Sequence, residues 1–126
     1  MRASQREIPI VAALKSPDRV PDQVVASFGD YEETVITYAV RWAWENRRIR
    51  DMTQARAAEL MGLTAPHFSN ILTGKKYLPA HKINSFESVV GNTAVSQTLQ
   101  RFRELRSRDM ATQIAQLVAD NLVRAA

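Results

Sequence analysis

The stretch TQARAAELMGLTAPHFSNILTGKK, residues 53–76, decides the fold that this sequence predicts. Two of the chain's four glycines, Gly62 and Gly74, lie in it, and each follows a run with apolar residues at helical spacing. Glycine is common just after a helix because it adopts a positive φ there without steric cost. Thr53 and Thr64 are suitable N-caps at the two starts. The stretch therefore predicts two short helices separated by a tight turn.

Each of these helices has one apolar face. The first face consists of Ala57, Ala58 and Met61, and the second of Phe68, Ile71 and Leu72. Pro66 falls in the first turn of the second helix, where its missing N–H would have had no helical partner. Because the turn at 62–64 is too short for an antiparallel pair, we expect the helices to cross steeply. The small Ala58 then lies at the contact.

Helical spacing of apolar residues continues on both sides of this pair. It predicts helices at 31–48, 79–90 and 94–106, with 108–124 as either an appended helix or a continuation of the last one. A short helix from Pro21 to Phe28 precedes them, and 8–14 reads as a strand or a turn. In the 31–48 helix, Arg47 and Arg48 fall in the last turn, where the helix dipole favours positive charge. We expect an all-α fold without a substantial sheet.

Length and composition bound the class of protein. The chain has 126 residues, which suits one domain, and it contains no cysteine. We therefore expect no disulfide, no thiol nucleophile and no thiolate metal site, and a reducing cytosol is the simplest location. No segment approaches the ~20 apolar residues of a membrane helix, and the N-terminus lacks the features of a signal peptide. We expect a soluble, cytoplasmic protein without membrane association.

Positive charge is concentrated in the middle of the chain. Residues 1–40 carry four basic and six acidic side chains, residues 41–82 carry eight and three, and residues 83–126 carry five and four. The net charges are therefore −2, +5 and +1, which sum to the formal +4. Such a distribution is typical of a polyanion-binding site, although a solvated face explains it equally well.

A family resemblance rests on the same stretch. It resembles the helix-turn-helix of the Cro/lambda-repressor type, the XRE family, at Thr53, Gln54, Ala57, Ala58, Met61, Gly62, Leu63, Thr64, Phe68, Ser69, Ile71, Gly74 and Lys75. The match covers 53–79 well and 35–105 loosely. It implies a five-helix DNA-binding domain at 31–106, an N-terminal extension at 1–30 and a C-terminal helix at 107–126 that is a candidate for dimerisation.

The resemblance also implies which residues meet DNA. The helix at 64–73 would lie in the major groove and Gln54 would bond a phosphate and brace that helix, so that the DNA-binding residues are Gln54, Arg56, Thr64, Ala65, Pro66, His67, Ser69, Asn70, Thr73, Lys75 and Lys76. Asparagine can bond adenine bidentately and histidine can donate to guanine. Ala65 and Pro66 stand where the family commonly has Gln or Ser, and they offer only apolar contacts. Arg47, Arg48 and Arg50 are weaker candidates for phosphate contacts.

Catalysis finds little support in the sequence. His67 and His81 are the only histidines, and no metalloprotease motif or glycine-rich phosphate loop is present. We expect no enzyme, no cofactor and no metal site.

The sequence thus predicts a sequence-specific transcription regulator of bacterial or phage type, a repressor, that binds a palindromic operator as a homodimer. Met110, Ile114, Leu117 and Asn121 recur at 4-3-4 spacing and form a candidate seam, unless this stripe packs back on its own domain. Two alternatives stay open. One is an antitoxin or protein-interaction module that neutralises a partner protein and represses its own operon, and the other is a helical bundle without DNA binding.

Overall fold

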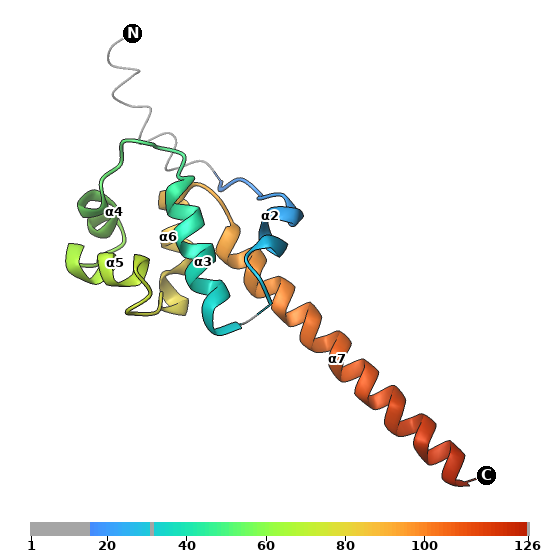
Figure 1. The fold of residues 1–126 in the computed structure, drawn as a ribbon. Coiled ribbons are helices and arrows are strands. Elements are labelled where there is room, and N and C mark those ends of the chain that lie inside the picture. The colour runs from blue at the N-terminus through green and yellow to red at the C-terminus, as the bar shows by residue number, and fades with distance from the viewer. Residues whose placement is uncertain (1–15, 31, 126) are drawn as a thin grey trace.

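The computed structural model describes residues 16–30 and 32–125, so the segment 8–14, read as a strand or a turn, lies outside the described part. Within the described residues the chain forms six α-helices, one 3-10 turn and no strand, which confirms the all-α fold class. The elements are α2 (Asp22–Ser27), α3 (Glu32–Glu45), α4 (Gln54–Leu60), α5 (Ala65–Leu72), η1 (Ala80–Lys82), α6 (Ile83–Val90) and α7 (Ala94–Ala125) (Figure 1).

The end of α3 differs from the prediction. The helix stops at Glu45, so Arg47 and Arg48 lie beyond its last turn, and the prediction for these two residues was wrong. The Arg47 guanidinium donates to the carbonyl oxygens of Trp44, Arg50 and Met52 at 3.0, 2.7 and 3.1 Å. The side chain therefore holds the connection to α4 in a turn instead of facing solvent from a helix.

Three further boundaries refine the predictions. The region 79–90 begins as the 3-10 turn η1 and becomes α-helical only at Ile83. The regions 94–106 and 108–124 form one continuous helix, α7, of 32 residues. Pro21 is the N-cap of α2 rather than its first helical residue.

The core forms around α3, which lies between the α4–α5 pair and α7 (Figure 1). Val35, Ala39 and Ala43 on its inner face are fully buried. The Trp44 ring meets Phe68 edge-on at 5.2 Å between centroids, so an aromatic contact joins α3 to α5. Aromatic pairs of this geometry add about 0.5–1.5 kcal/mol beyond the burial of their area.

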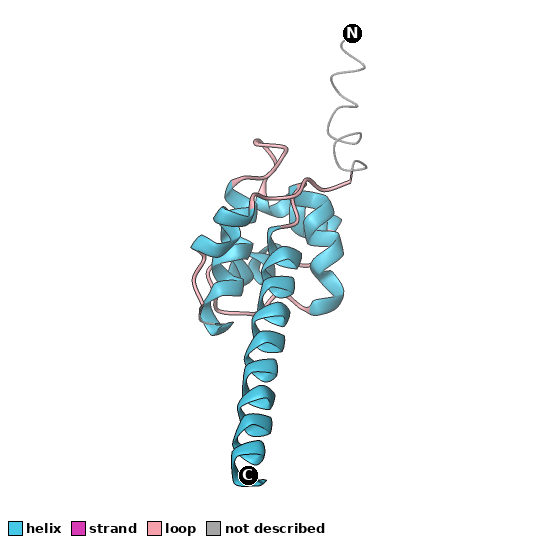
Figure 2. Ribbon diagram, turned by 90° about the vertical axis from the view of Figure 1, so that its right-hand side faces the viewer, coloured by secondary structure: helices cyan, strands magenta, loops and turns pink. Residues whose placement is uncertain are grey.

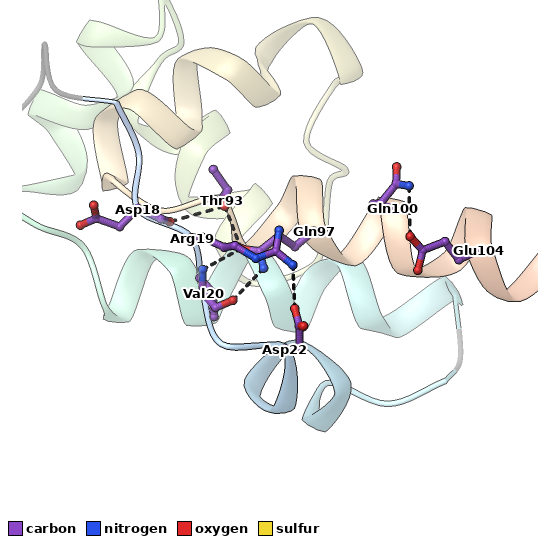
Figure 3. Close-up of polar contacts among 8 residues, drawn as sticks. All are labelled: Asp18, Arg19, Val20, Asp22, Thr93, Gln97, Gln100 and Glu104. Carbon is purple, nitrogen blue, oxygen red and sulfur yellow. Dashed lines mark hydrogen bonds and ion pairs between the residues drawn. The ribbon is translucent and has the colours of Figure 1, made fainter.

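The segment before α2 is built into this core. Val20 and Val25 are buried, although the sequence assigns them to an N-terminal extension at 1–30. The Gln97 amide on α7 accepts from the Val20 N–H and donates to the Val20 carbonyl, both at 2.7 Å (Figure 3). Asp18 N–H donates to the Gly91 carbonyl at 2.9 Å. Residues 18–27 therefore close one side of the domain against the first turns of α7.

The second half of α7 leaves the domain and projects away from it (Figures 1 and 2). Val95, Thr98 and Phe102 are buried, whereas every side chain from Ser107 to Leu122 is exposed. The prediction that 108–124 continues the preceding helix is confirmed. The alternative, in which its apolar stripe packs back on the domain, is wrong for these residues. Among the described residues, no helix combines the length and apolar character that crossing a membrane requires.

Candidate nucleic-acid interface

Threonine hydroxyls start both helices of the central pair. Thr53 Oγ1 accepts the Arg56 N–H at 3.1 Å, and Thr64 Oγ1 accepts the His67 N–H at 3.2 Å. Each hydroxyl satisfies one of the N–H groups that lack a partner within the first helical turn. Both predicted N-caps are confirmed. The hydroxyl of Thr64 is thus occupied by the helix end and has a structural role.

Glycines end both helices as the sequence predicts. Gly62 has φ +70° and Gly74 has φ +83°, which is the left-handed region. The N–H of the residue after each glycine donates back to the third carbonyl from the helix end. Leu63 bonds Ala58 at 2.8 Å and Lys75 bonds Asn70 at 2.9 Å. Both ends are therefore Schellman caps, which fix the direction in which the chain leaves each helix.

Burial orients α5. Phe68, Ile71 and Leu72 face the core, and Arg41 on α3 donates to the Leu72 carbonyl at 3.3 Å. A guanidinium at a helix C-terminus is favourable because it offsets the free carbonyls and the negative end of the dipole. α5 is therefore held from α3 at its C-terminal end, and its opposite face lies outward.

The outward face of α5 carries the predicted base-contacting residues. Ala65, Pro66 and His67 are exposed, and Ser69 and Asn70 are half-buried. The Asn70 side-chain amide has no hydrogen-bond partner among the described residues. Thr73, also exposed, donates its hydroxyl to the carbonyls of Ser69 and Asn70 at 3.1 and 3.2 Å, so this hydroxyl is already used.

The turn after α5 is joined through its backbone to Asn70 and carries three exposed side chains. The backbone N–H groups of Lys75 and Lys76 both donate to the Asn70 carbonyl, at 2.9 and 3.2 Å. Both lysines are exposed, and neither forms an ion pair with a residue in the described ranges. Tyr77 follows them and is 76% exposed. Sequence reasoning missed Tyr77, although an aromatic residue directly after Gly-Lys-Lys was a usable signal.

Most of the other basic residues of the middle segment hold backbone carbonyls. Arg48 donates to Ser16 and Gly91 carbonyls at 2.8 and 3.2 Å, and Lys82 donates to the Met61 carbonyl at 2.8 Å. The Arg47 guanidinium also lies 4.2 Å from the centroid of the Trp44 ring. The charge excess of residues 41–82 therefore overstates the charge available to a polyanion. Arg47 and Arg48 are engaged in the fold.

Gln54 and Arg56 on α4 are exposed, but neither side chain bonds α5 in the described structure. Arg56 pairs with Glu59 at 3.3 Å on the surface. A pair this exposed contributes little, so Arg56 can exchange Glu59 for another anion. The expected brace from Gln54 to α5 is not formed in this structure.

The described residues, 16–30 and 32–125, contain no cluster of three His, Asp or Glu side chains that could hold a metal ion. No family model, curated protein or solved structure matches the chain.

Proposed function

We propose that the chain is a sequence-specific DNA-binding transcription regulator of bacterial or phage type, a repressor, with residues 64–73 in the major groove of its operator. One observation carries the proposal. The Asn70 side-chain amide has no partner among the described residues, and two exposed lysines follow in a turn whose backbone bonds the Asn70 carbonyl, at the end of a helix whose other face is buried. An α-helix fits the major groove of B-DNA, where base edges are distinguishable. The protein would act in the cytoplasm, where such DNA is found.

Asn70 is the residue that we assign to base recognition. Its amide offers donors and an acceptor together, the combination that reads adenine bidentately. His67, one turn earlier and exposed, can donate to guanine acceptors. Ala65 and Pro66 can only contact a thymine methyl or the groove wall. Recognition by this helix therefore depends on few hydrogen bonds and partly on DNA shape.

Lys75, Lys76 and Tyr77 are the residues that we assign to the phosphate backbone. Lysine ammonium groups and the tyrosine hydroxyl both bond phosphate oxygens, and such contacts position a protein without reading sequence. Their turn is joined to Asn70 through the Asn70 carbonyl. Phosphate anchoring here would therefore set the depth at which Asn70 enters the groove. Arg56 and Gln54 would extend the contact on the α4 side.

Binding by fluorescence anisotropy to the DNA upstream of the chain's own gene, against scrambled DNA of equal length, tests this proposal. We expect the upstream DNA to bind about 10³-fold more tightly. Asn70→Ala should reduce that preference by about 1–3 kcal/mol, because one bidentate base contact is lost. Lys75→Ala with Lys76→Ala should weaken both DNAs alike and lower the steepness of the log–log salt dependence by about 1.8.

A control variant that removes the same charge distinguishes a direct lysine–phosphate contact from nonspecific electrostatic attraction to DNA. Arg19 and Arg108 line the groove beside α2 and α7, on the side of the domain away from α5 (Figure 1). Replacing both with alanine removes the same charge as the lysine double variant, and we expect a smaller loss of affinity. Equal weak binding to both DNAs that vanishes near physiological salt would contradict the proposal.

A protein-interaction module, such as an antitoxin, is the second candidate, and it is favoured by the exposed apolar residues of α7. The two functions are compatible because one surface lies on α5 and the other at the far end of α7. Two results together would favour this candidate over the regulator. The purified chain would bind a different protein through α7, and it would show no preference for the upstream DNA.

A further inference from the structure

The projecting half of α7 exposes an apolar face that its own domain does not use. Met110, Ile114, Leu117, Val118 and Leu122 are between 52% and 67% exposed. At about 100° per residue they fall within an arc of about 140°, which also contains Ala111 and Asn121. Asp109, Thr112 and Gln116 occupy the opposite side, and Gln113 and Asp120 border the stripe. A monomeric protein seldom leaves a contiguous apolar stripe of this kind in water.

This face is not the continuation of the helix's inner face. The buried face of the first half is centred on Val95, Thr98, Leu99 and Phe102. By the same spacing, the centre of the projecting stripe is rotated by about 110° from it. The domain body therefore lies to the side of the stripe and does not stand in front of it. A second helix can approach along its whole length.

The apolar residues of 8–14 follow too closely before Ser16 to cover most of the stripe. Ser16 is held beside Gly91, just before α7, because the Arg48 guanidinium bonds both carbonyls. Ile8 can reach at most about 27 Å from Ser16 in a fully extended chain. Met110 lies about 24 Å and Leu122 about 42 Å along the helix from Ala94. Most of the stripe is therefore beyond the reach of residues 8–14.

We propose that a second copy of this chain covers the stripe, as a parallel two-stranded coiled coil over residues 107–122. Met110, Ile114, Leu117 and Asn121 have the 4-3-4 spacing of a coiled-coil seam. Asn121 faces its own counterpart, and such a pair favours two strands in a fixed register. The positions that flank this seam carry one charged side chain per chain, Asp120, beside Ala111, Gln113 and Val118, so a second copy fits without a strongly charged partner. This inference does not depend on DNA binding and is tested without DNA.

Sedimentation equilibrium over about a hundredfold range of protein concentration measures the association. The mass of the full chain should rise with concentration from 14.2 kDa to twice that value. Leu117→Asp should weaken association by at least about a hundredfold, because it places a charge in the seam. Thr112→Asp, the same new charge on the polar side, should associate as the wild type does. Leu117 is exposed in a single chain, so fluorescence of the buried Trp44 should be unchanged in both variants.

The absence of cysteine allows a second measurement in an otherwise unaltered chain. Asn121→Cys should form a disulfide between two copies under mild oxidation, and Thr112→Cys should not. A chain that stays at 14.2 kDa at every concentration overturns the inference. So does a Leu117→Asp variant that associates like the wild type, or a dimer in which Asn121→Cys does not cross-link. Occupation of the stripe only by a different protein would appear as the first of these results.

Discussion

At the scale of single residues, the contact between the loop after α3 and the end of α6 depends on the absence of one side chain. Gly91 ends α6 with φ +78°, and the Arg48 side chain lies directly against it. An added Cβ would come within 2.7 Å of Arg48 Cβ and 2.8 Å of its Nε. Arg48 cannot withdraw freely, because it also bonds the Ser16 and Gly91 carbonyls.

Gly91→Ala should therefore lower the free energy of unfolding by more than the left-handed backbone alone accounts for. The backbone conformation costs a non-glycine residue about 1–2 kcal/mol, and displacement of Arg48 adds about 1–3 kcal/mol for its broken hydrogen bonds. Urea unfolding followed by tryptophan fluorescence measures the change. The expected total is about 2–5 kcal/mol, which combines the two contributions.

Gly29→Ala is the matched control. Gly29 also has a positive φ, +105°, but an added Cβ would meet no atom within 4 Å. Its loss of stability should reflect the backbone term only. Equal losses in the two variants would show that the contact with Arg48 contributes nothing.

Residue-scale features were predictable from sequence where their causes are local. Thr53 and Thr64 as N-caps, and Gly62 and Gly74 as positive-φ ends, depend on neighbours within four residues. The partners of the basic side chains were not predictable in this way. Lys82 bonds the Met61 carbonyl 21 residues away, a contact that exists only once α4 and α6 have packed together.

At the scale of elements, one side chain joins the segment before α2 to α7. The Gln97 amide pairs with both backbone groups of Val20, a residue that is itself buried (Figure 3). Gln97→Ala should lower the free energy of unfolding by about 1–3 kcal/mol, because it leaves a donor and an acceptor without partners. Chemical denaturation measures this, and hydrogen exchange of residues 18–27 should accelerate.

Gln100 provides the comparison on the same helix. It is exposed, and its amide bonds only side chains of its own helix, donating to Glu104 at 3.3 Å (Figure 3) and accepting from Arg103 at 3.5 Å. Gln100→Ala should change stability by no more than about 0.5 kcal/mol, as surface substitutions usually do. Similar effects at 97 and 100 would mean that the segment before α2 is not held by this amide.

Element boundaries were predictable where a glycine or a cap stood in the sequence, and less so elsewhere. The sequence left open whether 94–106 and 108–124 are one helix or two. Between the two parts the apolar face shifts around the helix axis. In the sequence this shift looks like an interruption of the helical spacing. No glycine or proline follows Asn92, so the backbone has no reason to stop, and the structure continues through both parts.

At the scale of the whole molecule, the folded unit and the projecting helix are separable. Between Ala94 and Leu122 the last buried residue of α7 is Phe102, and the side chains of residues 107–122 are all exposed. The candidate DNA surface depends on the first part alone, because α5 is held by α3 and α4. Dimerisation would depend on the second part alone. We therefore expect loss of the projecting helix to lower operator affinity strongly while changing the free energy of unfolding little.

Deletion of residues 107–126 tests this separation. At low protein concentration the free energy of unfolding should change by no more than about 1 kcal/mol, because the side chains of 107–122 are all exposed. Affinity for a palindromic upstream site should fall by about 10²-fold or more, because the two half-sites are no longer bound by linked domains. Weak binding to scrambled DNA should persist. If loss of the seam causes the lower affinity, full-length Leu117→Asp should lose the same affinity. A deletion variant that does not fold would instead show that the projecting helix belongs to the folded unit.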